Sequence, residues 1–235
     1  MLSYDLDKML YTLPADKHKP EDIKEILREH PEVKFVSLVG IDIGGHDTDE
    51  KIPVEEFLGD IEKFLSSGVQ TDGSSVVLPK IAALNNAKVD IIPDVTVNWF
   101  VDHNFNYPDP YTGLPVGTLR IPSSLVHNDS ERVGSRVILR DAIYNFKQDL
   151  MKLLSENPYV FEYMDLNSAD EIDQIVITAA TELEFWVKTP DDDADREQLS
   201  TAQMLKEQYW KRTTGPVRTA LEEAMLVLQK YGFEM

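Results

Sequence analysis

The stretch EDIKEILREHPEVKFVSLV constrains the fold most, because it places an amphipathic helix directly before a strand. Residues Glu21–His30 carry apolar side chains at helical spacing, and Pro31 ends that pattern. Residues Val33–Val39 then alternate as a half-buried strand does. A helix with one apolar stripe and a strand with one apolar face bury these surfaces by packing on each other. We therefore expect an α+β protein.

Helix and strand patterns continue along the chain. Further helices are expected at Val54–Leu65, Ser135–Ser155 and Pro216–Tyr231, the last with Gly232 as its C-cap. Short strands are expected between Gln70 and Val101, and again over Ile172–Val187. The Pro- and Gly-rich residues 106–124 are expected to be a loop.

A shift in composition near residues 122–130 divides the 235 residues into two expected domains. Residues 1–125 would form a small domain of strands and helices. Residues 126–235 would begin a second domain whose pattern is incomplete, because GFEM after the last helix is typical of another strand starting.

The charge balance excludes several classes of partner. The chain has 42 acidic and 23 basic side chains, a formal net charge of −19, and no cysteine. A field of that sign repels nucleic acid and anionic lipid, so neither is an expected partner. Lack of cysteine excludes disulfides and zinc–thiolate sites and suits a reducing compartment. With no secretory signal and no apolar run that could span a membrane, we expect a cytoplasmic protein.

Two glutamates, Glu182 and Glu184, lie in TAATELEFWV, a run expected to be a strand. Strand side chains alternate, so the two carboxylates share one face, with Cα atoms roughly 6.5–7 Å apart. Such like charges repel unless water or cations intervene. Mg²⁺ or Mn²⁺ binds oxygens of this kind, and two ions can share the pair. An exposed strand face that tolerates two acids explains the same spacing.

The segment TDGSS (Thr71–Ser75) is the second candidate. Asp72 and Gly73 form a turn signal, and a hairpin corner accounts for it fully. In the functional interpretation, Asp72 presents a carboxylate from a rigid loop, with Ser74 and Ser75 as hydrogen-bonding neighbours.

Taken in order, the motifs resemble the amino-terminal part of a glutamine synthetase. VKFVSLVGIDIGG is similar to the opening strand pair of that family, and GVQTDGSS stands where the family has a Phe-Asp-Gly-Ser-Ser loop. VDIIPDVTV, TGLPVGTLRIPSS and SRVILRDAI follow as the next strand, loop and helix of the family do. TELEFWV matches its Glu-x-Glu-Phe strand, and GPVRTALEEAMLVLQKYGFEM its later helix. The resemblance covers most of residues 20–235.

The resemblance implies a fold and a reaction. The fold is a small β-grasp-like amino-terminal domain (residues 1–125) followed by the first, incomplete part of an α+β catalytic domain (residues 126–235). The reaction is ATP-dependent ligation of ammonia to glutamate through a γ-glutamyl phosphate. Two or more divalent cations, Mg²⁺ or Mn²⁺, neutralise the phosphate charge during the transfer.

It also implies roles for four residues. Glu184 matches a ligand of the first metal, and Glu182 a ligand of the second metal on the ATP side. Asp72 matches the aspartate that binds ammonium and removes its proton, and Ser75 matches the loop serine beside it. In this family the loop completes the site of a neighbouring subunit, so a ring-shaped homo-oligomer is implied.

The chain also departs from the family pattern. Gln70 and Thr71 replace the residues before the loop aspartate, and Ala87 and Lys88 stand where the family often has Ser-Asp. The later metal ligands and nucleotide-binding arginines of the family have no counterpart in the 235 residues. We therefore expect an amino-terminal piece that is catalytically inactive alone. Two alternatives remain: a ligase that joins glutamate to another amine, and a standalone non-catalytic module that binds a partner.

Overall fold

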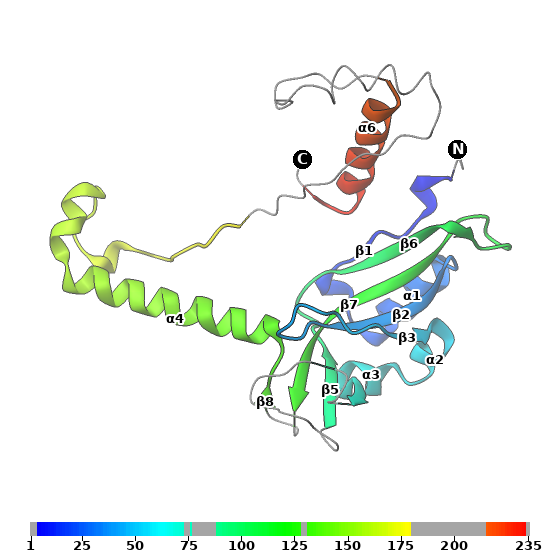
Figure 1. The fold of residues 1–235 in the computed structure, drawn as a ribbon, viewed down its shortest axis with the longest axis horizontal. Helices are drawn as coiled ribbons and strands as arrows, with labels where there is room; N and C mark the ends of the chain where they lie inside the picture. Colours follow the sequence, from blue (N-terminus) through cyan, green and yellow to red (C-terminus); the bar gives the residue numbers. More distant parts are fainter. Residues whose placement is uncertain (1–3, 73–75, 77–87, 128–130, 180–214, 234–235) are drawn as a thin grey trace. The chain divides into compact units, whose positions relative to one another are not determined.

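The computed structural model describes residues 4–72, 76, 88–127, 131–179 and 215–233. The chain divides into two compact units, Met1–Ile175 and Val176–Met235, and each is described by itself. The first unit combines a mixed, mainly antiparallel sheet with helices (Figure 1), which confirms the predicted α+β class.

The first unit contains eight described strands in one sheet. They are β1 (Thr12–Leu13), β2 (Val33–Gly40), β3 (Glu50–Pro53), β4 (Val69–Asp72), β5 (Lys88–Pro93), β6 (Trp99–Pro108), β7 (Pro115–His127) and β8 (Glu131–Arg132). Its helices are α1 (Pro20–Glu29), α2 (Val54–Gly59), α3 (Ile61–Ser67) and α4 (Ser135–Glu156). Short 3₁₀ turns are η1 (Leu6–Lys8), η2 (Ala15–Lys17), η4 (Pro158–Tyr163) and η5 (Ala169–Glu171).

Strand β7 is the centre of the sheet. It pairs antiparallel with β6, β5 and β8, and parallel with β2, whose other neighbour is β3. The expectation of a loop over residues 106–124 is therefore wrong from Pro115 onward. Pro122 brings no amide donor, but its carbonyl accepts a hydrogen bond from the Asp94 amide (2.8 Å). Pairing on both sides outweighs the weak strand propensity of proline and glycine.

One face of the sheet carries the core. Helix α1 begins with Pro20 at its first turn and buries Ile23 and Leu27, one helical turn apart. These side chains pack with the alternate residues of β2, β6 and β7 that point to the same face, and with Phe57 of α2 and Ile61 of α3. The predicted helix at Glu21–His30 and strand at Val33–Val39 are confirmed to within one residue at each end.

The single helix expected over Val54–Leu65 is two helices. Asp60 leaves the helical conformation, and its carbonyl oxygen accepts hydrogen bonds from the amides of Lys63 and Phe64, which begins α3. Gly59 and Asp60 are poor helix formers, so the break falls where propensity is lowest.

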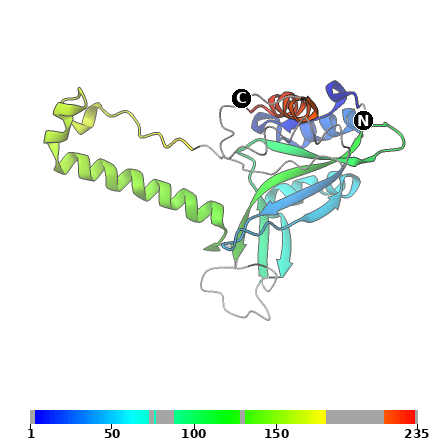
Figure 2. The ribbon, with the colours of Figure 1, turned by 45° about the horizontal axis from the view of Figure 1, so that its top comes forward.

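Helix α4 confirms the predicted helix at Ser135–Ser155 and joins the sheet through its first turn only. Both the amide and the hydroxyl of Ser135 donate to the Ile41 carbonyl (3.0 and 3.2 Å), and the Arg136 guanidinium binds the Asp94 carboxylate at 2.7 Å. Val137 is the buried residue of this helix. Beyond it, α4 leads away from the sheet (Figure 2).

The strand predicted over Ile172–Val187 is not formed in its described part, since residues 172–179 pair with no described strand. Residues 180–187 lie outside the described residues. In the second unit, α6 (Gly215–Lys230) confirms the predicted last helix, and Gly232 ends it with φ of 86°.

The predicted domain boundary between residues 125 and 126 falls inside β7 and stays a prediction. Among the helices that the structure describes, none combines the length and the apolar character needed to cross a membrane.

Candidate functional site

Asp72 is the last residue of β4 and lies opposite Lys88, the first residue of β5. One residue earlier, Thr71 lies opposite Val89, which in turn lies opposite His127 of β7. Figure 2 shows these paired strand ends at one end of the sheet. Asp72 is therefore the last residue of a strand that is paired with β5 up to this end.

The simplest hairpin, with a two-residue turn at Asp72 and Gly73, does not agree with the strand pairing. In a two-residue hairpin, pairing would resume directly after the turn. Here the partner of Asp72 is Lys88, so residues 73–87 make the connection. The strand predicted at Ser75–Leu78 falls in this connection, and all of it but Val76 lies outside the described residues.

Gly68 fixes where β4 starts. Its φ is 62°, and a Cβ at this position would lie 1.9 Å from the Ile91 carbonyl oxygen. Glycine adopts this left-handed conformation without strain and lets α3 end directly against β5. The location of Asp72, four residues later, depends on this close approach.

The other predicted site residues are Ser75, Glu182 and Glu184, and all three lie outside the described residues. Within the described ranges, no three histidine, aspartate or glutamate side chains are grouped so that they could hold a metal ion.

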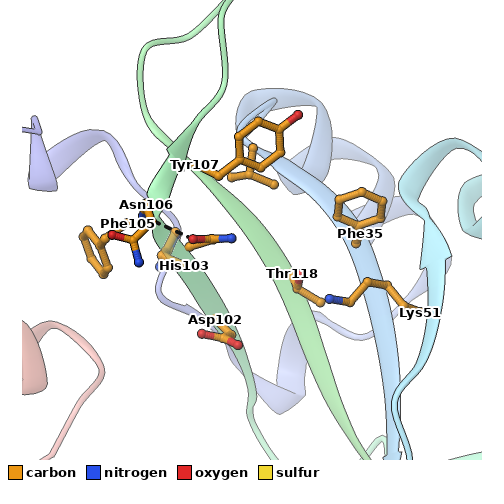
Figure 3. A pocket seen from close by; sticks show the side chains of 10 residues that line it. Phe35, Lys51, Asp102, His103, Phe105, Asn106, Tyr107 and Thr118 are labelled. Atoms are coloured by element: carbon orange, nitrogen blue, oxygen red, sulfur yellow. Dashed lines mark hydrogen bonds between the residues drawn. The ribbon is translucent and has the colours of Figure 1, made fainter.

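A second candidate site lies on the sheet face opposite the core. On this face, Asp102 of β6 lies opposite Thr118 of β7, and Thr118 lies opposite Phe35 of β2. Lys51 of β3 lies opposite Ser37, two residues further along β2. These side chains border a hollow of about 430 Å³, which we call the face pocket (Figure 3). Its lining residues are Phe35, Lys51, Asp102, His103, Asn104, Phe105, Asn106, Tyr107, Val116 and Thr118.

The polar groups of the face pocket have distinct surroundings. The Lys51 ammonium lies 5.7 Å from the centre of the Phe35 ring and 3.8 Å from an Asp49 carboxylate oxygen. Figure 3 shows the Lys51 chain reaching toward Thr118. Thr118 is buried, with only 7% of its surface exposed. Asp102 is exposed.

Two neighbouring groups set the charge around the face pocket. Arg120 already binds Asp47 at 2.7 Å and Asp49 at 3.5 Å, so its charge is neutralised locally. Burial lowers the pKa of the His103 imidazole, and the negative charges of Glu32 and Asp102 oppose this shift without cancelling it. A neutral His103 leaves Lys51 and Asp102 as the two formal charges of the lining.

Sequence reasoning did not find the face pocket. Alternation along Val33–Val39 puts Phe35 and Ser37 on one face, but Thr118 was expected in a loop. Without β7, no pattern in the sequence brings β6 beside β2.

A scan against protein-family models finds no match to this chain, and a search of curated proteins finds none either. The resemblance to glutamine synthetases therefore rests on the order of the short motifs.

Proposed function

We propose that the chain is the amino-terminal part of a glutamine synthetase, an enzyme that uses ATP to join ammonia to glutamate. The observation that carries the proposal is the order of motifs from VKFVSLV through TDGSS and VDIIPD to TELEFWV. The α+β architecture supports it, because a β-grasp-like domain is a small mixed sheet with a helix packed on one face. The parallel β2–β7 pair, with α1 packed on one face of the sheet, supports the proposal.

The position of Asp72 supports its proposed role. A carboxylate that takes a proton from ammonium must be held within hydrogen-bond reach of it, and a residue at the end of a paired strand is well fixed. In the proposed enzyme, Asp72 would serve a site built largely by other parts of the protein. In the proposed ring, these parts belong to a neighbouring subunit.

The proposed metal centre needs more ligands than the Glu182–Glu184 pair supplies. Mg²⁺ takes six oxygen ligands, several of them water, and holds near-ideal octahedral geometry. Glu182 and Glu184 would supply two carboxylates, and the described residues contain no further cluster. When bound, the cations would neutralise phosphate charge.

Metal binding by the purified chain tests the role of the glutamate pair. Mn²⁺ is titrated into the chain and free Mn²⁺ is measured by electron paramagnetic resonance. We expect weak binding that the double substitution E182Q/E184Q reduces at least tenfold. The matched control is D191N/D193N, which removes two acids at the same spacing and should leave binding unchanged. Equal losses in both variants, or none in either, would contradict the proposed metal site.

Activity tests the ligase proposal itself. The 235-residue chain should show no γ-glutamyl transfer from glutamine to hydroxylamine with Mn²⁺ and ADP, and measurable turnover would refute the claim that the site is incomplete. The product of the full reading frame should form glutamine from glutamate, ammonia and ATP. There D72N should lower kcat by about 10²–10⁴, the usual contribution of a general base. A full-length product that binds Mn²⁺ but makes no glutamine would favour another amine acceptor or a non-catalytic module.

A further inference from the structure

We propose that the face pocket binds a small zwitterion whose carboxylate lies at Lys51 and Thr118 and whose ammonium group lies at Asp102. This site is on the open face of the sheet and is independent of the proposed synthetase chemistry. Two observations carry the proposal: a cation and a hydroxyl lie together in the pocket, and an anion lies one strand away from the hydroxyl.

The cationic end combines the charge of Lys51 with the hydroxyl of Thr118. No described group makes a hydrogen bond to the Thr118 hydroxyl, although the residue is 93% buried, with 7% exposed. Thr118 lines the pocket, where its hydroxyl could donate a hydrogen bond to a ligand oxygen. The Lys51 ammonium reaches toward the same place (Figure 3), and its contact with Asp49 is long, at 3.8 Å. An ammonium and a hydroxyl together suit a carboxylate.

The anionic end is Asp102. Its carboxylate has no cation within ion-pair distance among the described residues, although it lines the pocket. It lies next to Thr118 in the β6–β7 register, on the side away from β2 and β3. A ligand ammonium at Asp102 would therefore lie across the pocket from a carboxylate at Lys51.

The distance between the charged groups of the pocket limits the length of the ligand. Neighbouring strands lie about 4.8 Å apart, so the backbones of β6 and β3 are separated by roughly 14 Å across β7 and β2. The Lys51 side chain spans part of that width above Phe35. Because Thr118 and Asp102 lie on neighbouring strands, the two charges of the ligand must be separated by a short aliphatic chain, which would lie beside Val116. One cation and one anion in the lining disfavour dianions and dications of the same length.

Three probes of equal chain length test this selection. 5-Aminopentanoate, glutarate and 1,5-diaminopentane are titrated separately into the ¹⁵N-labelled chain, and amide chemical shifts are followed by NMR. We expect 5-aminopentanoate to bind with a Kd of about 1 mM and to shift amides of β6, β7 and β3. Glutarate and the diamine should bind at least tenfold more weakly. Equal binding of all three, or no binding of 5-aminopentanoate at 50-fold the expected Kd, would overturn the proposal.

Substitutions assign each charge. K51Q and D102N should each weaken 5-aminopentanoate binding at least tenfold, and both residues are exposed enough for the fold to persist. K63Q and D141N change exposed residues of the same types on α3 and α4 and should leave the Kd unchanged. D102N should also reduce the discrimination against glutarate, because it removes the repulsion. If K51Q and D102N bind as the unmodified chain does, the pocket is not the site.

Discussion

His18 is held between two backbone carbonyls and an indole ring. Its Nδ1 lies 3.0 Å from the Val95 oxygen, its Nε2 lies 3.2 Å from the Leu13 oxygen, and its ring stacks on Trp99 with centroids 3.7 Å apart. Carbonyl oxygens only accept hydrogen bonds, so the imidazole must supply the donor. His18 thereby links β1 to the turn before β6.

Replacing His18 by phenylalanine should keep the stacking and remove the donor. Because a buried carbonyl then loses its partner, we expect H18F to lower the free energy of unfolding by about 1–3 kcal/mol. Urea denaturation followed by circular dichroism measures this change. The control is H46F, at a side chain that is 77% exposed, which should stay within about 0.5 kcal/mol. Equal stability of H18F and H46F would show that the two contacts do not stabilise the fold.

His103 should make stability depend on pH. Burial lowers the pKa of its imidazole in the folded chain, against the opposing charges of Glu32 and Asp102. The unfolded chain, with a histidine pKa near 6.5, then binds a proton that the folded chain does not. The stability that this pKa difference of His103 gives to the folded chain is therefore fully present above about pH 6.5 and is lost as the pH falls below it.

The substitution H103F removes this titration and keeps an aromatic ring beside Tyr11. Between pH 7.5 and 5.0, the unmodified chain should lose more stability than H103F, with a difference of at most about 1.4 kcal/mol per pH unit. Urea midpoints at several pH values give the comparison. H46F should follow the unmodified chain, since this side chain is 77% exposed. Parallel pH profiles for H103F and the unmodified chain would refute the prediction.

At the scale of elements, the junction of α3 and β4 depends on one glycine. In G68A, the new methyl group would lie 1.9 Å from the Ile91 oxygen in a chain with φ of 62°. We expect a loss of more than about 3 kcal/mol, or no cooperative transition. G59A is the control, because nothing lies within 4 Å of its Cβ, and alanine should stabilise the end of α2 by about 0.5–1 kcal/mol. Thermal melts of the two variants should shift in opposite directions.

The attachment of α4 depends on its first turn. Partial burial raises the pKa of the Asp94 carboxyl, but hydrogen bonds from Thr96 and the Arg136 guanidinium outweigh burial, so the net shift is downward. The ionised Asp94 carboxylate therefore stabilises the folded chain. This stabilisation is present above about pH 3.9 and is lost as the pH falls through the lower folded-state pKa of Asp94.

R136M removes the guanidinium, and amides in the first turn of α4 should then exchange hydrogen faster. Stability should fall by about 1 kcal/mol or less, because Arg136 is 34% exposed and water screens the pair. R140M, which removes an exposed pair with Asp141, is the control and should leave exchange unchanged. Unchanged exchange in R136M, measured by mass spectrometry, would place the anchor elsewhere.

Helices were predictable from sequence and β7 was not, for a physical reason. The stripes of α1, α4 and α6 are local, since residues three and four apart share a face. Strand β7 is stabilised by partner strands far along the chain, and Pro122 and Gly117 lower its local strand propensity. Asp72 ends β4, and its pairing with Lys88 depends on a connection whose length no local motif gives.

At the scale of the whole molecule, net charge should oppose folding. A formal charge of −19 makes the compact state repel itself, and salt screens that repulsion. Raising NaCl from 20 to 300 mM should therefore increase the free energy of unfolding in urea by on the order of 1 kcal/mol. A decrease would mean that attractive pairs such as Arg120–Asp47 dominate the electrostatics.

The central parallel pair has a consequence for how the chain is made. Val36 pairs with Leu119, so β2 has no inner neighbour until the residues of β7, Pro115–His127, have been synthesised. Closing so long a loop is entropically costly and slows folding. During translation, β2 and α1 would emerge from the ribosome before β7, and their apolar faces would stay exposed until β7 pairs with β2. Translation speed between β2 and β7 would then set how long a chaperone must shield the nascent chain.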